Sequence, residues 1–295
     1  MESSAPNICA NCGKGEEESD NLKTCTACKM VKYCNRDCQI AHRSQHKKAC
    51  KKRAAELRDE QLFKDVEPEE CPICMLPLPL ESYTAIFHSC CGKRICNGCV
   101  YAMKMSEGKD LCAFCRTPPE TSDEEQIKRL KKLMAKGNGD AFAMFAGYYV
   151  NGSRGLPQDR QKAKELLLKA GELGCASGYY NLGVAYDEGR GVEVNMKKAK
   201  YYWELAAMNG SVNARHNLGS VEGESGNYQR ALKHMMISAT AGHEGSLGAV
   251  KVCFQNGMIT KDGYENVLRA YQQRKDEMKS DARDKAKIEM GLVNR

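Results

Sequence analysis

The amino-acid sequence predicts a mainly α-helical protein in which two small cysteine-rich modules precede an α-solenoid of helix pairs. Three observations predict this architecture. Of the 17 cysteines, 15 lie before residue 116, and ten of these form pairs with C-x2-C spacing. A pattern of glycines and alanines recurs at a period near 36 residues after residue 138. The chain has 295 residues, which exceeds the roughly 150 residues of a typical domain, so we expect several units.

Composition limits the compartment and the partners. Residues 1–8 lack a basic segment followed by an apolar one, so we expect no signal peptide. No apolar run approaches the roughly 18 residues of a membrane span. We therefore expect a soluble intracellular protein, cytoplasmic or nuclear, whose cysteines are kept as thiols and serve metal binding rather than disulfides.

Net charge gives little support for a nucleic-acid partner. The formal charge is +7, from 45 basic and 38 acidic residues, and the chain has one tryptophan. No basic stripe interleaved with aromatic residues is present. Proteins and peptides are the expected partners.

The first cysteine cluster has the spacing of zinc ligands. Short C-x2-C loops let two thiolates reach one tetrahedral zinc ion, and four ligands close a structural site. The eight candidates, enough for two ions, are Cys9, Cys12, Cys25, Cys28, Cys34, Cys38, His46 and Cys50.

With Tyr33 before the fifth ligand and Gln39 after the sixth, residues 9–50 resemble a MYND finger. The resemblance implies binding of short proline-containing peptides, although Arg43 stands where the family often has tryptophan. His42 competes with His46 because both share a helix face with Cys38 and Cys50, but the x7 and x3 gaps select His46. Family pairing places Cys9, Cys12, Cys34 and Cys38 on one zinc ion and Cys25, Cys28, His46 and Cys50 on the other.

A charged segment separates the two clusters. Residues 51–68 contain a few apolar side chains among many charged ones and end near Pro68, which predicts a helical connector. Its basic run is better explained as a solvated helix face than as a nuclear localisation sequence.

The second cluster lies between residues 71 and 115 and contains eight cysteines, again enough for two ions. The predicted ligands are Cys71, Cys74, Cys90, Cys91, Cys96, Cys99, Cys112 and Cys115. Together the two clusters predict about four zinc ions per chain.

The motifs Cys71-Pro-Ile-Cys74 and Cys112-x-x-Cys115-Arg116 make residues 71–116 resemble the all-cysteine RING of the ubiquitin-ligase subunit of the CCR-NOT complex. A RING is cross-braced: its first and third ligand pairs share one zinc ion, and its second and fourth share the other. The resemblance implies one site from Cys71, Cys74, Cys96 and Cys99. Cys91, Cys112 and Cys115 need a fourth ligand, for which Cys90 is favoured and His88 is the alternative.

The RING resemblance implies a surface for a ubiquitin-conjugating enzyme. Ile73, Val100 and Tyr101 would form its apolar patch, and Arg116 matches the cation that steadies the conjugate. A RING has no nucleophile of its own, so no catalytic residue is predicted, and Ala113 replaces a proline that is usual in the family. A RING-type ubiquitin ligase and a non-enzymatic adaptor with structural zinc sites therefore both remain as hypotheses.

A helix is predicted over residues 122–137 between the second module and the repeats. Ser122 and Glu125 have the spacing of a capping box, and apolar residues then recur at helical intervals up to Met134. Gly137 follows the predicted end of this helix, which we expect to couple the zinc region to the rest.

Residues 138–271 predict the solenoid. Gly147, Gly183 and Gly219 are each 36 residues apart, and the pattern resembles Sel1-like repeats over residues 138–245, with a degenerate capping pair up to residue 271. The resemblance implies stacked helix pairs whose concave face binds proteins. Trp203 is expected in the core, and residues 272–295 form a charged helix or tail. The combination of modules resembles a MYND, RING and Sel1 family of algae such as diatoms.

Overall fold

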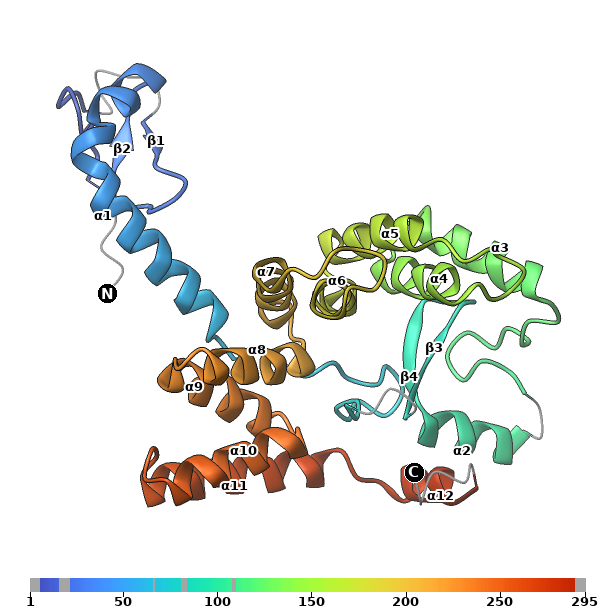
Figure 1. Cartoon of the computed structure of the whole chain (residues 1–295). Helices are drawn as coiled ribbons and strands as arrows, with labels where there is room; N and C mark the ends of the chain where they lie inside the picture. Colours follow the sequence, from blue (N-terminus) through green and yellow to red (C-terminus); the bar gives the residue numbers. More distant parts are fainter. Residues whose placement is uncertain (1–5, 16–21, 66, 81–83, 108–109, 290–295) are drawn as a thin grey trace. The chain divides into compact units, whose positions relative to one another are not determined.

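The computed structural model describes residues 6–15, 22–65, 67–80, 84–107 and 110–289 (Figure 1). The chain divides into two compact units, Met1–Lys64 and Asp65–Arg295. Across these described ranges, every helix is too short or too polar to cross a membrane.

The first unit consists of a two-stranded sheet and one long helix. Strands β1 (Lys23–Thr24) and β2 (Lys32–Tyr33) pair antiparallel, and α1 (Arg36–Leu62) follows. The Asn35 side chain caps α1 by accepting a hydrogen bond of 2.9 Å from the Cys38 amide. α1 continues without interruption from the finger through residue 62, so most of the predicted connector extends the same helix that carries the last ligands.

The core of this unit is made mostly of the candidate metal ligands. Its buried residues are three cysteines, at positions 9, 25 and 28, together with Tyr33. So few apolar side chains bury too little surface to hold a fold of this size. The unit therefore depends on its ligands for stability.

The second unit begins with a hairpin and a helix. β3 (Ala85–His88) pairs antiparallel with β4 (Lys93–Cys96), and α2 (Asn97–Glu107) follows directly. Cys90 and Cys91 lie in the hairpin turn, which ends at Gly92 with a φ of +71°. Ile95 is fully buried among the cysteines of this module.

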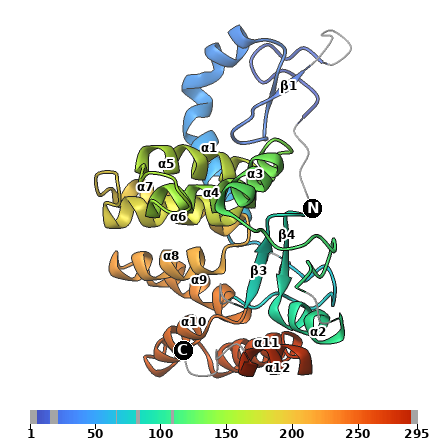
Figure 2. The same ribbon diagram turned by 90° about the vertical axis from the view of Figure 1, so that its right-hand side faces the viewer.

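The helices of the solenoid form antiparallel pairs that stack side by side (Figures 1 and 2). Those from the coupling helix onward are α3 (Asp123–Met134), α4 (Gly139–Asn151), α5 (Arg160–Glu172), α6 (Ala176–Glu188), α7 (Met196–Met208), α8 (Val212–Glu224), α9 (Tyr228–Thr240), α10 (Glu244–Gln255) and α11 (Lys261–Glu277).

Caps and small residues explain why the repeats form helices that pack closely. The Ser122, Asn138, Asp159, Asn195 and Ser211 side chains each cap the helix that follows. Between successive pairs the backbones approach closely: a Cβ on the α6 glycine at position 178 would lie 2.6 Å from a carbonyl oxygen of α5. One apolar core spans α3 to α6, and a second spans α9 to α11, so neighbouring pairs bury their apolar faces against one another, as expected of a solenoid.

The C-terminal segment of the chain returns to the second metal module. α12 (Asp281–Glu289) packs against α2, as Figures 1 and 2 show. Two of its side chains are buried there, Arg283 and Ala286. The predicted charged tail thus includes the end of α11 and a docked helix, and residues 290–295 lie outside the described residues.

Candidate metal centres

Four C-x2-C pairs fold into the same turn. The amide that follows each pair donates a hydrogen bond of 2.9 Å to the carbonyl of the first cysteine. The residue that donates has a left-handed φ between 56° and 75° in every case. These residues are Gly13, Lys29, Met75 and Arg116.

Three of these turns place a non-glycine residue in a conformation that costs about 1–2 kcal/mol for L-amino acids. Lys29, Met75 and Arg116 all carry this cost. The turn brings both thiols of a pair to one side, where a single ion can bind them. Metal binding at these turns would offset this strain.

The structure brings the sixteen predicted ligands together in four groups of four. Within each group the ligand atoms all lie within 4.8 Å of one another. The groups are Cys9, Cys12, Cys34 and Cys38; Cys25, Cys28, His46 and Cys50; Cys71, Cys74, Cys96 and Cys99; and Cys90, Cys91, Cys112 and Cys115.

The sulfur separations fit tetrahedral zinc. Zinc–sulfur bonds of about 2.3 Å place tetrahedral thiolates about 3.8 Å apart, whereas a disulfide needs about 2.05 Å. The Sγ atoms of Cys71 and Cys99 are 3.8 Å apart, as are those of Cys74 and Cys96. In the last group, the Cys115 and Cys90 sulfurs are 3.4 Å apart.

His46, and not His42, lies with the cysteines of the second ligand group. Nε2 of His46 lies 3.2 Å from Sγ of Cys28. The His42 ring stacks on that of His46 with centroids 5.6 Å apart, and its Nδ1 lies 3.1 Å from the hydroxyl of buried Tyr33. His42 therefore packs against the ring of His46 and bonds Tyr33 but does not join a ligand group.

Cys90, and not His88, completes the fourth group. His88 ends strand β3 and is half-buried, and burial lowers the pKa of its imidazole. The hairpin turn instead directs both adjacent cysteines, Cys90 and Cys91, toward Cys112 and Cys115. Of the two alternatives, the structure therefore places Cys90 with the other three cysteines.

Without metal, the thiols of this fourth group titrate unequally. Burial raises the pKa of Cys90, and its hydrogen bond with Cys115 raises it further. Burial also opposes ionisation of Cys115, but hydrogen bonds from Thr117 outweigh it and lower the pKa of Cys115 to about 6. At neutral pH the group would hold both thiolates and thiols, so an ion that binds there releases protons.

Arg283 is a site residue that the sequence did not reveal. From α12, its Nη1 atom donates hydrogen bonds of 2.8 Å and 2.7 Å to the carbonyls of Pro77 and Met278. Its Nη2 atom lies 3.3 Å from the carbonyl of Leu76 and 3.5 Å from Sγ of Cys74. The guanidinium therefore connects the C-terminal helix, through hydrogen bonds, to the turn that contains Cys71 and Cys74 of the third ligand group.

The charge of Arg283 suits this position. Burial opposes the charge, but the thiolates of Cys96 and Cys74 raise the pKa of the guanidinium. Four thiolates around a divalent ion carry a net negative charge, which a neighbouring cation offsets. Arg283 is 4% exposed, so this interaction is shielded from solvent.

The predicted partner-binding residues differ in exposure. Ile73 is 41% exposed on the first turn of the second module, and Arg116 is exposed on the last. Val100 and Tyr101 on α2 are half-buried, and Val100 packs against the cysteine-rich core. Phe114, which sequence analysis did not select, is 46% exposed between the last two ligands.

Family comparisons match two parts of this architecture. A sequence model of the MYND finger matches residues 9–50. The model of the Sel1 repeat matches residues 142–175, 176–211 and 212–243. The chain carries a MYND finger and three Sel1 repeats. The MYND match spans the first two ligand groups, and the Sel1 matches span α4 to α9.

Curated relatives are similar over short stretches. A putative sel1-like repeat-containing protein, L21, of Acanthamoeba polyphaga mimivirus is 35% identical over 63 residues, which is 21% of this chain and 12% of that protein. The ERAD-associated E3 ubiquitin-protein ligase component HRD3B of Arabidopsis thaliana is 34% identical over 98 residues, or 33% of this chain and 15% of that protein. The chain thus spans less than a sixth of the length of either relative.

Two solved structures of Sel1-type repeat proteins align with part of this chain. A Sel1 repeat protein from Oxalobacter formigenes is 21% identical with a TM-score of 0.44, covering 61% of this chain and 69% of that one. The antigen c5321 of uropathogenic Escherichia coli is 23% identical with a TM-score of 0.45. The alignment covers 66% of this chain and 41% of the antigen. A MYND finger joined to Sel1 repeats, with further cysteine groups able to bind metal, indicates a protein-interaction role.

Proposed function

We propose that this intracellular protein is a RING-type ubiquitin ligase that selects substrates through its MYND finger and Sel1 repeats. The interleaving of ligands in the second module carries this proposal. Cys71 and Cys74 group with Cys96 at the end of β4 and Cys99 on α2. The two cysteines of the hairpin turn, which lie between these pairs in the sequence, group instead with Cys112 and Cys115. This crossed order is the arrangement that the RING resemblance implied.

Zinc is the ion proposed for all four groups. Four thiolates, or three thiolates with one imidazole, form the donor sets of structural zinc sites, and each group offers one of these sets. Because protein side chains would fill all four coordination positions of each ion, none would remain open for a substrate. The ions would therefore hold the modules in shape and take no part in chemistry.

Two further observations support the ligase. Ile73 is exposed on the turn where a RING contacts its conjugating enzyme, and Arg116 is exposed after the last ligand. The Arabidopsis relative, similar to this chain over 98 residues, is named as a component of an E3 ubiquitin-protein ligase.

The second candidate function is a non-enzymatic adaptor. Val100 packs into the module core, which removes part of the predicted apolar patch. Ala113 stands where a RING usually has proline, and it is also half-buried against that core. An adaptor would use the same MYND and Sel1 surfaces without engaging a conjugating enzyme.

Autoubiquitination tests the ligase directly. The zinc-loaded full chain should form ubiquitin conjugates with at least one member of a panel of conjugating enzymes. Ile73→Ala and Arg116→Ala should each reduce the initial rate about tenfold, since truncating a central contact of a small interface costs more than about 1 kcal/mol. Gel analysis of conjugate formation over time measures the rate.

Leu268→Ala is the matched control because Leu268 on α11 is also 41% exposed. This variant should retain the full rate. No conjugates with any enzyme, from protein shown by mass to hold its zinc, would reject the ligase and leave the adaptor. Equal rates for all variants would reject the proposed contact surface.

A further inference from the structure

The three Sel1 repeats differ at one equivalent position. Gly147, Gly183 and Gly219 occupy the same place on α4, α6 and α8. In the second repeat a Cβ on Gly183 would lie 2.3 Å from the indole of Trp203. In the third repeat a Cβ on Gly219 would lie 2.8 Å from Met235. A large side chain of the partner helix therefore fills the space beside each of these two glycines.

The first repeat leaves this space open. Leu167 stands 36 residues before Trp203 and is its equivalent on α5. A Cβ on Gly147 would meet no atom within 4 Å, so the shorter leucine does not reach it. The result is a pocket of about 210 Å³ with both residues in its lining.

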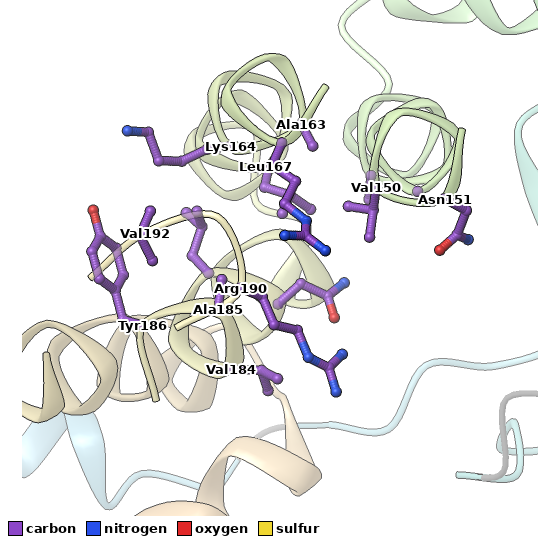
Figure 3. A pocket seen from close by; sticks show the side chains of 15 residues that line it. Val150, Asn151, Ala163, Lys164, Leu167, Val184, Ala185, Tyr186, Arg190 and Val192 are labelled. Carbon is purple, nitrogen blue, oxygen red and sulfur yellow. The ribbon is translucent and has the colours of Figure 1, made fainter. Parts of the chain in front are cut away.

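The pocket has an apolar interior. Figure 3 shows Val150 of α4, Leu167 of α5 and Val184 of α6 around it, with Val192 of the following loop. A dry cavity of about 150 Å³ between apolar side chains is enough for a benzene-sized molecule. One leucine or methionine side chain would therefore fit in this space.

Basic side chains also line the pocket. Arg160 and Lys164 come from the first turns of α5, and Arg190 comes from the loop after α6. Arg190 pairs with Glu188, whereas Arg160 and Lys164 have no carboxylate partner among the residues that the structure describes. A Cβ on Gly191 would lie 2.5 Å from Cβ of Arg160, so the loop holds the arginine stem in place.

We propose that this pocket binds an acidic segment of a partner protein. One leucine- or methionine-sized side chain of the segment inserts beside Gly147, and its flanking carboxylates pair with Arg160 and Lys164. An apolar pocket with convergent polar groups is the usual form of a ligand site. The proposal rests on the proposed role of the repeats in selecting partners, and it requires no ligase activity.

Fluorescence anisotropy with the full chain tests this site. The probe is a fluorescein-labelled peptide with the sequence Glu-Glu-Leu-Glu-Glu, compared with versions that carry alanine at the centre or lysine at the flanks. The acidic leucine peptide should bind at least about tenfold more tightly than either comparison peptide, and added salt should weaken it.

Two variants place the binding in the pocket. Leu167→Trp transfers the tryptophan of the second repeat to the first and should reduce affinity at least about tenfold. The double variant Arg160→Glu, Lys164→Glu reverses two charges and leaves Leu167 in place, and it should reduce affinity by a similar factor. The test therefore stands even if the tryptophan disturbs folding. Leu168→Trp, at a 39% exposed neighbour, is the control that should bind normally.

Affinity that is unchanged in both Leu167→Trp and the charge variant would overturn the proposal. Equal binding of the acidic, alanine and lysine peptides would overturn it too. The peptide-binding test contains no conjugating enzyme. Absence of peptide binding would therefore say nothing about ligase activity, and absence of ligase activity would say nothing about peptide binding.

Discussion

Removal of the metal by a strong chelator should unfold residues 9–115 and leave the Sel1 helices largely intact. Both finger cores consist largely of the candidate ligands, so bound ions would provide the free energy that a small apolar core cannot. Structural zinc contributes about 10–16 kcal/mol per site in small fingers. Each Sel1 repeat instead buries apolar side chains against its neighbours.

Hydrogen exchange followed by mass spectrometry separates the two regions within one chain. Peptides from residues 9–115 should lose protection after chelation, whereas peptides from α5 to α9 should keep it. Restored protection after zinc is added back is the control. Retained protection in both fingers after complete zinc removal would contradict the metal assignment.

Replacing Arg283 with alanine should weaken the third ligand group and release α12. The change removes the donor to the carbonyls of Pro77 and Met278 and the cation beside Cys74, whereas the Leu76 carbonyl still accepts from the Cys71 amide. An unsatisfied buried group costs about 1–3 kcal/mol, so we expect the free energy of unfolding to fall by about 2 kcal/mol. One zinc ion of four should then transfer to a chelator faster than in the natural chain.

A colorimetric chelator competition measures this release, and hydrogen exchange reports on α12. Arg283→Lys keeps the charge, but an ammonium group cannot bond several carbonyls as the planar guanidinium does. Its rate of zinc release should therefore lie between those of the natural chain and Arg283→Ala. Arg269→Ala is the control because that arginine bonds within exposed α11. Zinc release from Arg283→Ala at the natural rate would show that the C-terminal helix does not support the metal site.

Local features of the site were predictable from the sequence because short-range spacing determines them. Two cysteines three positions apart face one ion in almost any fold, and a glycine pattern at 36 residues requires a repeating helix pair. The capping of α3 by Ser122 also followed from local chemistry, although Glu125 accepts a hydrogen bond from the Thr121 amide instead of the Ser122 amide.

Features that depend on distant contacts were not predictable. Arg283 is 209 residues from Cys74 and belongs to a segment whose composition indicates only a charged tail. Spacing alone could not choose between Cys90 and His88, because the turn of the β3–β4 hairpin decides which side chain faces the ion. Comparison of the repeat sequences shows that the first repeat has Leu167 where the second has Trp203, but it does not show the pocket beside this leucine.

Native mass spectrometry of the full chain tests most directly whether sixteen side chains hold four zinc ions in crossed pairs. The natural chain should carry four ions after a brief wash with chelator. Cys71→Ser with Cys96→Ser should lose one ion, because both serve the same group, whereas Cys71→Ser with Cys91→Ser should lose two. The reverse result, with two ions lost by the first pair and one by the second, would mean that the ligands are used in sequence order and would contradict the account.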